Sequence, residues 1–251
     1  SCPRHGGSGR GRKVQQSAVK KFAQEKGLHV LQPTNLKDEN FIASLRALQA
    51  NLQVVVAFRM LPRVVWDMPE FGTFNLHASL LPEYRGAAPI NWALINGEHQ
   101  TGVTTFFIDD KIDTGAIIAQ RSTTIDPDEN AGDLHDRLMN QGAALVVETL
   151  RKIVTNTVTT TNQPQQGIEK TAYKLNKENT RIDWNTSAGV IHNLIRGLSP
   201  YPAAWTVLEN GDDEQINLKV YNSGVELKGH DLVPGAVLVE DKKLKIACSN
   251  G

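Results

Sequence analysis

An asparagine and a histidine two positions apart are the polar side chains of this sequence best suited to chemistry. Asn75 and His77 lie in or directly after the run 73–76, which can extend as a strand, and Pro82 forbids a helix through 79–81. Alternate residues of a strand share a face, so the two side chains should point the same way. A carboxamide can donate a hydrogen bond to an oxygen that gains negative charge, and an imidazole can donate or carry a proton. The pair therefore indicates a site for a carbonyl that becomes a tetrahedral oxyanion, at a strand end, where open α/β sheets bind ligands.

A carboxylate is expected to complete this site. Asp113 lies in the loop between the strand-like runs 103–108 and 116–120, so an adjacent strand could bring it back to His77. Beside the imidazole it would keep the ring oriented and favour its charged form. Each residue alone is more often structural, since a histidine beside apolar residues is commonly part of a core and Asp-Thr-Gly is a common turn. The catalytic hypothesis therefore depends on the three residues together.

The elements that should position these residues alternate between helix and strand. A helical stripe of apolar residues covers 14–26 and ends at Gly27, and a second helix, capped by Asn35 or Asp38, runs through Ala47. The continuous apolar run 54–58 has the pattern of a strand covered on both faces, which is typical of parallel sheets. The predicted fold class is α/β, with a doubly wound, mostly parallel sheet in the first domain.

The rest of the chain predicts a second, smaller domain. Helices over 87–95 and from 132 to about 154, with two strands between them, complete a first domain at residues 1–154. Residues 155–167 are mostly Thr, Asn and Gln, which cannot build a core, so we interpret 155–171 as the interdomain linker. Residues 172–251 contain one helix and several short alternating strands separated by Gly, Asn and Asp, a pattern that predicts a small β-barrel.

Composition places the chain among ordinary soluble proteins. Its 251 residues suffice for one or two domains, and 40% of them are hydrophobic and 22% charged. We find neither an apolar run long enough to span a membrane nor a signal peptide, so the cytoplasm is the expected compartment.

Charge and ligand-forming residues limit the possible partners. The 27 basic residues balance 27 acidic ones, which argues against a chain that binds nucleic acid over its whole surface. The first 24 residues differ, because they hold six basic residues and no acidic one and could meet phosphates, although a solvated flexible end would look the same. Asp109, Asp110 and Asp113 are close together, but no histidine or second acidic cluster accompanies them, so we expect no metal site. Cys2 and Cys248 suggest neither a disulfide framework nor a zinc site.

The motif Asn75-x-His77-x-Ser79-Leu80-Leu81-Pro82, with Asp113 downstream, resembles the folate-dependent formyltransferases, which move a formyl group from 10-formyltetrahydrofolate to an amine. The longer string from Ser79 to Ile90 is similar to the members of that family that act on methionyl-tRNA, and the similarity runs from Gly9 to the last residue. This resemblance implies that Asn75 and protonated His77 stabilise the oxyanion, and that Asp113 holds His77 in its charged form and helps a proton move.

The resemblance also implies binding residues and partners. The folate would contact Ala57, Phe58, Arg59, Met60, Ser79, Leu80, Leu81, Pro82, Ile108, Asp109 and Asp110. The acceptor would be initiator methionyl-tRNA, contacted by Arg10, Arg12, Lys13 and Lys174. The second domain would be an OB-like barrel, and we expect a monomer.

Other acceptors and a non-enzymatic role also fit the sequence. The amine could instead belong to an amino-sugar nucleotide or to glycinamide ribonucleotide. In the resembling family a strand, a helix and another strand precede the motif Gly9-Arg10-Gly11, so we expect this sequence to lack that N-terminal part and also the end of the barrel. A chain without its outer pieces could be a non-catalytic folate-binding or RNA-binding fragment.

Overall fold

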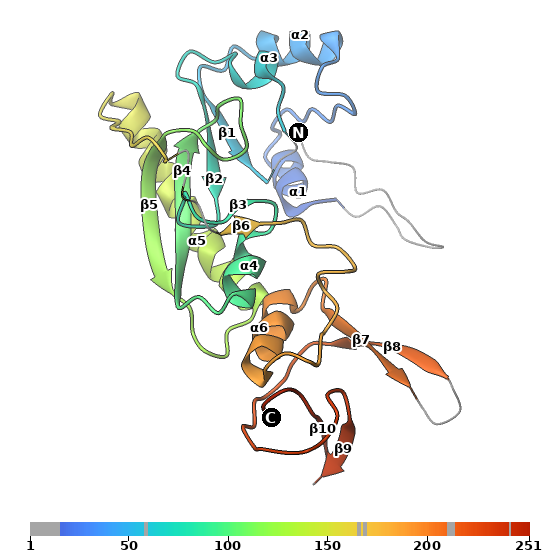
Figure 1. The fold of residues 1–251 in the computed structure, drawn as a ribbon. Helices are drawn as coiled ribbons and strands as arrows, with labels where there is room; N and C mark the ends of the chain where they lie inside the picture. The colour runs from blue at the N-terminus through green and yellow to red at the C-terminus, as the bar shows by residue number, and fades with distance from the viewer. Residues whose placement is uncertain (1–15, 58–59, 165–166, 168–169, 210–213, 241) are drawn as a thin grey trace. The chain divides into compact units, whose positions relative to one another are not determined.

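The structure is a computed structural model that describes residues 16–57, 60–164, 167, 170–209, 214–240 and 242–251 (Figure 1). The chain forms two compact units. The first comprises the described residues of 1–53 and 58–73, and the second comprises 54–57 and the described residues of 74–251. No helix in the described part of the chain has the length and hydropathy that crossing a bilayer requires.

The described residues of the first unit form three short helices. They are α1 (Ala18–Glu25), α2 (Glu39–Ala47) and α3 (Arg63–Trp66). The hydroxyl of Ser17 accepts a hydrogen bond from Lys20 N, and the carboxylate of Asp38 accepts one from Phe41 N. These caps satisfy backbone donors that a helix N-terminus leaves unpaired. The first two helices therefore begin where cap residues allow, within the ranges that the sequence predicted.

A four-stranded sheet lies at the centre of the second unit. Its strands, in spatial order, are β1 (Gln53–Val56), β2 (Thr73–His77), β4 (Gln100–Phe107) and β5 (Ile117–Thr124). The predicted mostly parallel sheet is wrong for the pairs β2·β4 and β4·β5, which are both antiparallel. A short loop, 108–116, joins β4 to β5, and antiparallel neighbours can be joined by such a loop whereas parallel ones need a long crossover.

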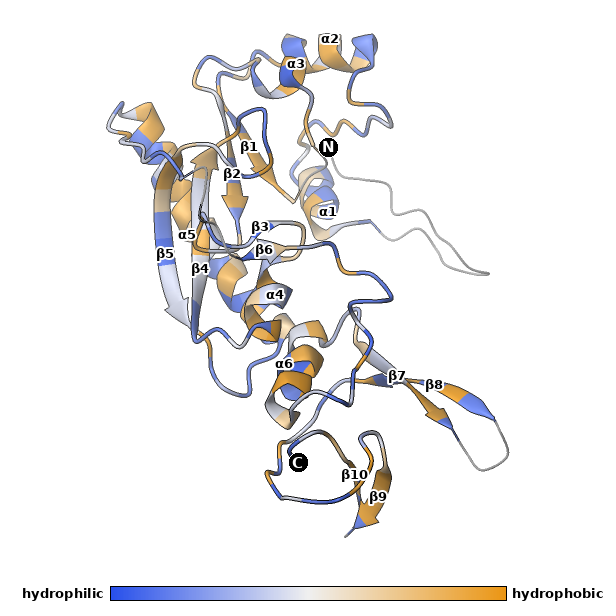
Figure 2. Ribbon diagram, viewed as in Figure 1, coloured by the Kyte–Doolittle hydropathy of each residue, from blue (hydrophilic) through white to orange (hydrophobic). Residues whose placement is uncertain are grey.

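The apolar run that suggested parallel strands is not buried on both faces. In β1 intermediate and exposed residues alternate, and Val54 and Val56 are exposed. Burial is concentrated instead in β4, which is buried from Thr101 to Phe106. The edge strand β5, the other neighbour of β4, is apolar at its start and polar from its middle onward, and Figure 2 shows the strand blue at its middle and pale at its end.

The long helix α5 (Ala131–Val154) packs on β4 and β5 and closes the main core. Asn130 caps it, because its side chain accepts hydrogen bonds from Gly132 N and Asp133 N. Its buried leucines recur at helical spacing, and the hydroxyls of Thr149 and Thr105 pair at 2.8 Å between helix and sheet. The buried residues of this core are Tyr84, Ala93, Leu94, Val103, Ile125, Ala131, Leu134, Leu138, Leu145 and Ala172.

A second apolar cluster in this unit comprises Ile182, Ile191, Ile195, Leu198, Ala204 and Cys248. Six further elements of the second unit are a helix after residue 88 and five elements beyond residue 187. They are α4 (Pro89–Ile95), α6 (Ala188–Leu198), β7 (Ala204–Glu209), β8 (Gln215–Val220), β9 (Val237–Glu240) and β10 (Lys243–Ile246). Helix α6 packs on α4, where Asn91 Nδ2 donates to Gly197 O at 2.7 Å. Within the described residues, β7·β8 and β9·β10 form two separate antiparallel pairs, so barrel closure is not part of the observed fold.

The segment after α5 contacts β5 and the loop that follows β2. Thr161 pairs with Ile117 through two backbone hydrogen bonds of 2.8 and 2.9 Å. Further on, β6 (Thr171–Ala172) lies parallel to β3 (Arg85–Gly86). Residues 155–171 thus connect the two apolar clusters and also pack on the loop that follows β2.

A cluster of polar side chains fastens this segment to that loop. Tyr84 Oη donates to Glu98 Oε1 at 2.6 Å, and Lys170 Nζ lies 2.6 Å from the same oxygen. Burial, together with the Glu98 carboxylate, raises the pKa of Tyr84, so its hydroxyl remains a donor. Burial alone would raise the pKa of Glu98, but the hydrogen bonds from Lys170 and Tyr84 hold it below its ordinary value.

We expect this cluster to make stability depend on pH in the acid range. Because the pKa of Glu98 in the folded chain lies below 4.5, its contribution to the free energy of unfolding is complete above pH 4.5 and is lost as the pH falls through the lowered value. Glu98→Gln should therefore destabilise the chain by ~1.5–3 kcal/mol at neutral pH, the range for a hydrogen bond to a charged group. Urea unfolding of both proteins across this range measures the difference. A penalty of constant size down to the most acid pH would contradict the assignment.

Candidate active site

Strand β2 places the predicted asparagine and histidine in the interior of the second unit. Asn75 is opposite Phe106 and His77 is opposite Thr104 in the pairing with β4. The two residues are only 3% and 6% exposed. Since they alternate along one strand, their side chains share a face, as the sequence predicted.

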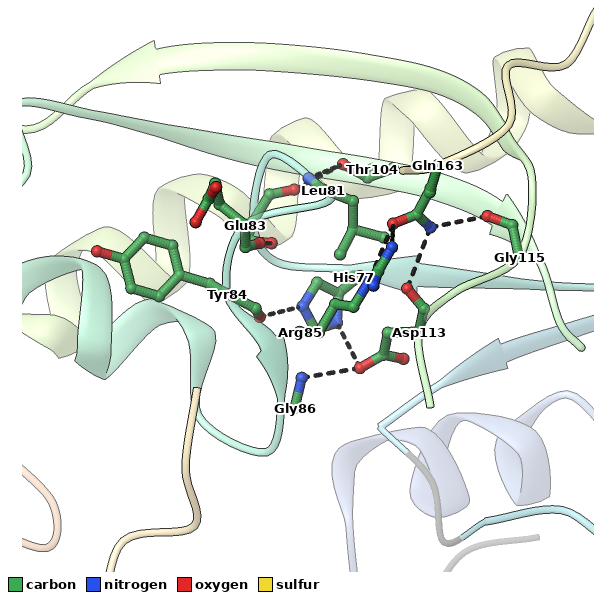
Figure 3. Close-up of polar contacts among 11 residues, drawn as sticks. His77, Leu81, Glu83, Tyr84, Arg85, Gly86, Thr104, Asp113, Gly115 and Gln163 are labelled. Carbon is green, nitrogen blue, oxygen red and sulfur yellow. Dashed lines mark hydrogen bonds and ion pairs between the residues drawn. The ribbon is translucent and has the colours of Figure 1, made fainter. Parts of the chain in front are cut away.

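The ring of His77 is fixed at one edge by a backbone group. Its Nε2 lies 2.8 Å from the carbonyl oxygen of Tyr84 (Figure 3). A carbonyl oxygen can only accept, so Nε2 carries the proton of this hydrogen bond. The other edge of the ring, with Nδ1, faces Asp113, whose Oδ2 is 3.8 Å away. The structure thus brings His77 and Asp113 together, at a separation longer than a direct hydrogen bond.

The Asp113 carboxylate reaches this position from a tightly folded turn. Asp113 has φ 54°, in the left-handed region that residues other than glycine rarely adopt. Its Oδ2 accepts a hydrogen bond of 2.9 Å from Gly86 N, and the residue is only 7% exposed. A side chain on Gly115 would clash with the carbonyl oxygen of Phe107, so the turn closes directly against β4. Thr114 Oγ1 donates to Asp109 Oδ1 at 2.7 Å and braces the start of the loop.

A guanidinium and a glutamine, neither of which the sequence singled out, lie beside the turn. Arg85 Nη2 donates to Gln163 Oε1 at 2.6 Å, and Gln163 Nε2 donates to the backbone of the turn (Figure 3). Burial lowers the pKa of Arg85, while the nearby Asp113 and Asp109 carboxylates oppose this effect. Arg85 belongs to a recognisable motif, but Gln163 lies in a polar segment whose composition gives no signal of a buried role.

Asn75 contains a buried oxygen that nothing in the described residues satisfies. Its Oδ1 is inaccessible to solvent and has no hydrogen-bond partner in that part of the chain. Such an atom costs about 1–3 kcal/mol, so natural proteins rarely keep one without a reason. The other end of the carboxamide, Nδ2, is the end that can donate, and it lies on the strand face that Asn75 shares with His77.

The loop Ser79–Pro82 is fixed by side chains of the neighbouring strands. Leu81 N donates to Thr104 Oγ1 at 3.2 Å, and Gln120 Nε2 donates to Leu81 O at 2.8 Å. Ser79 Oγ donates to Glu83 O at 2.7 Å, so this hydroxyl is engaged in the structure of the loop. Ser79 and Leu81 are buried, whereas Leu80 and Pro82 are partly exposed. The loop directly follows β2, and these hydrogen bonds hold its backbone in place.

The other predicted binding residues lie in several places. Ala57 is exposed with φ 48°, and Met60 is exposed in the first unit, whereas Phe58 and Arg59 lie outside the described residues. Ile108 and Asp109 are partly buried and Asp110 is exposed in the β4–β5 loop. Of the predicted tRNA contacts, Lys174 is exposed, and Arg10, Arg12 and Lys13 lie outside the described residues. Among the residues with described positions, no group of three His, Cys, Asp or Glu side chains could hold a metal ion.

Comparisons with known proteins give consistent matches. Residues 2–150 match the Formyl transferase family and residues 174–251 match the formyl transferase C-terminal domain. The chain is similar to the methionyl-tRNA formyltransferase of Flavobacterium johnsoniae, with 59% identity over 97% of this chain and 77% of that protein. It is similar to the methionyl-tRNA formyltransferase of Bacteroides fragilis, with 49% identity over 97% of this chain and 76% of that protein.

Solved structures show the same fold at low identity. The sugar 3N-formyl transferase WlaRD superposes with a TM-score of 0.65 at 20% identity, over 95% of this chain and 80% of its own. HypX from Aquifex aeolicus, solved with tetrahydrofolic acid, gives a TM-score of 0.63 at 20% identity, over 83% of this chain and 35% of its own.

We expect Asn75→Leu to leave the chain as stable as the wild type or to raise its free energy of unfolding by about 1 kcal/mol, because leucine removes the buried unpaired oxygen and keeps four side-chain heavy atoms. Asn75→Ala is the matched control, since it also removes the amide but leaves a cavity and should be less stable than the leucine variant by ~2–5 kcal/mol. Chemical denaturation of the three proteins measures both differences. If the leucine variant unfolds more easily than the alanine variant, the cost assigned to the buried oxygen is wrong.

Proposed function

We propose that this chain, which belongs to the methionyl-tRNA formyltransferase family, transfers a formyl group from 10-formyltetrahydrofolate to the amino group of methionyl-initiator tRNA. One observation supports this most directly: a buried histidine and aspartate, 3.8 Å apart, follow an asparagine with an unpaired oxygen, in a chain 59% identical to such an enzyme. We propose that it works in the cytoplasm as a monomer, at the start of translation.

Asn75 and His77 would act on the formyl oxygen as it gains negative charge. The Asn75 carboxamide shares the strand face of His77 and can donate one N–H to that oxygen. Nε2 of His77 is engaged with Tyr84 O, so the Nδ1 edge is the edge that can serve the reaction. When it is bound, 10-formyltetrahydrofolate supplies the formyl group.

Asp113 would orient His77 and help a proton leave the attacking nitrogen. The 3.8 Å between Nδ1 and Oδ2 is too long for a direct hydrogen bond, so a water molecule or the amine itself would bridge them. Gly86 N holds Oδ2 at 2.9 Å, which keeps the carboxylate from turning away from the ring. This arrangement can pass a proton between the carboxylate, the imidazole and the reacting nitrogen.

We propose that the folate is contacted by residues of three segments. These comprise Ala57 to Met60, Ser79 to Pro82, and Ile108 to Asp110. The hydrogen bonds from Thr104 and Gln120 that fix Leu81 support such a role, because a preformed wall orients a flat ring without ordering a loop first. We further propose that 155–171 separates a catalytic domain from an OB-like domain.

The tRNA would be bound through Arg10, Arg12, Lys13 and Lys174, and through cations close to Lys174. Lys177 Nζ lies 5.1 Å and Arg181 Cζ 5.5 Å from the centre of the Trp205 ring, and both cations are exposed. Two exposed cations beside one aromatic ring suit the phosphate backbone of a nucleic acid. The identities of 49–59% to methionyl-tRNA formyltransferases favour this acceptor over an amino sugar or glycinamide ribonucleotide.

A formylation assay tests the proposal on this chain. We expect charged initiator tRNA to be formylated when 10-formyltetrahydrofolate is present. Asn75→Ala and His77→Ala should each lower kcat about 100- to 1000-fold, the usual cost of losing a donor to a developing oxyanion, while folate binding measured by calorimetry is retained. Gly189→Ala, on the open surface of α6, is the matched control. Near-normal turnover in both site variants would refute the assigned roles, and an inactive wild type that still binds folate would support the non-catalytic alternative.

Salt dependence distinguishes tRNA from a small amine. Each phosphate that Lys177 or Arg181 neutralises should contribute about 0.7–0.9 to the slope of log affinity against log salt concentration, so the double variant Lys177→Ala/Arg181→Ala should have a slope smaller by roughly 1.5. Filter binding of tRNA at several salt concentrations measures it. Arg151→Ala, an exposed change on α5, should leave the slope unchanged. An unchanged slope in the double variant would exclude these cations from the tRNA interface.

A further inference from the structure

One glutamine from the segment after α5 is buried in the second unit. Gln163 is only 5% exposed, although its neighbourhood is a polar run of Thr, Asn and Gln. The pairing of Thr161 with Ile117, two residues earlier, sets the register that delivers the side chain to this position. The burial of Gln163 is therefore a consequence of a defined backbone pairing and not of an arbitrary fold of a loop.

The orientation of the Gln163 amide is determined by its partners. Its Nε2 donates to Asp113 O at 3.1 Å and to Gly115 O at 2.7 Å. Its Oε1 accepts from Arg85 Nε at 3.1 Å and from Arg85 Nη2 at 2.6 Å (Figure 3). Carbonyl oxygens only accept and a guanidinium only donates, so the amide cannot be reversed. All four hydrogen-bonding positions of this side chain are used.

The partners of Gln163 belong to the two backbone segments that hold the Asp113 carboxylate. The turn from Asp113 to Gly115 carries the carboxylate, and Asp113 is in the unfavourable left-handed region with φ 54°. Arg85 precedes Gly86, whose N–H binds Asp113 Oδ2. One side chain therefore ties the strained turn to the strand that anchors its carboxylate.

We propose that Gln163 is a positioning residue, which keeps the Asp113 carboxylate facing Nδ1 of His77. This inference rests on the proposed function for its kinetic readout. Without the amide, the carbonyl groups of the turn lose their donor, and Arg85 loses its two hydrogen bonds to Gln163 Oε1 and keeps the one to Pro164 O at 3.2 Å. The Asp113 carboxylate already attracts the Arg85 guanidinium, as its effect on the pKa of Arg85 indicates. Arg85 would then turn toward this carboxylate and compete with His77 for it. Residues 155–171 thus control the geometry of the active site through one side chain.

Two substitutions separate the parts of this role. Gln163→Met keeps a side chain of similar length and removes every hydrogen bond. Gln163→Glu keeps an acceptor for Arg85 but directs an oxygen at the two carbonyl groups in place of a donor. Gln141→Met is the matched control, because Gln141 lies on α5 and its Nε2 donates to Ser122 O of β5 at 3.1 Å, and within the described residues it makes no hydrogen bond to Gln163, Arg85 or the turn. Thermal unfolding establishes that each variant is folded at the assay temperature.

The test compares kcat, KM and the coupling to Asp113. We expect kcat to fall about 10- to 100-fold in both Gln163 variants with both KM values within about threefold, because a small displacement of a catalytic group costs this much. Gln141→Met should have wild-type kcat. In an Asp113→Asn background, Gln163→Met should have no further effect, since its action passes through Asp113. A kcat within twofold of wild type in Gln163→Met, or a full additional loss in the double variant, would overturn the proposal.

A second readout does not depend on formyl transfer. The ring nitrogens of ¹⁵N-labelled His77 report on the group that Nδ1 faces. We expect these NMR signals to shift in Gln163→Met and to remain in place in Gln141→Met. If the wild-type chain transfers no formyl group, only the proposed function fails, and the NMR comparison alone decides the role of Gln163. Unchanged His77 signals in Gln163→Met would then overturn it.

Discussion

The approach of the Asp113 carboxylate to the buried ring of His77 is the interaction on which the rest of this structure depends. Both side chains are only 7% exposed. Removing two ionisable groups from water is expensive, and the attraction between them offsets this cost only when further hydrogen bonds satisfy their remaining atoms. Here the Gly86 N–H binds the carboxylate and the Tyr84 carbonyl accepts from the imidazole. The pair is stable because the backbone of the loop after β2 completes it.

The supports of the pair come from distant parts of the sequence. Strand β2 supplies the histidine, the β4–β5 loop supplies the aspartate, and residues 155–172 return to hold both. Gln163 binds the turn, β6 pairs with β3, and Lys170 joins the polar cluster around Glu98. Gln163 fixes the β4–β5 loop and the other two supports fix the loop after β2, so the second unit holds the candidate site residues through backbone pairing and polar contacts.

The sequence predicted the approach of Asp113 to His77 and the positions of the helices better than it predicted the sheet. The spacing of Asn75 and His77 predicted that they share a strand face, and the position of Asp113 in a loop predicted its approach to the ring of His77. The direction of the strands could not be read from the run 54–58, because a short apolar run has the same composition whether one face or both faces are covered. Gln163 was missed for a related reason. A polar side chain in a polar segment carries no local signal, and only the pairing of Thr161 with Ile117 brings it inside.

The hairpin of β4 and β5 also has a bearing on how the polypeptide reaches its native state. Its register runs from Gln100–Thr124 to Phe106–Ile117, so its contacts span few residues and their loop-closure entropy is small. Such a hairpin can form early, before Gln163 has emerged from the ribosome. The aspartate turn would then exist before its glutamine partner, and the nascent polypeptide would complete the contacts around Asp113 only after the stretch beyond α5 has left the exit tunnel.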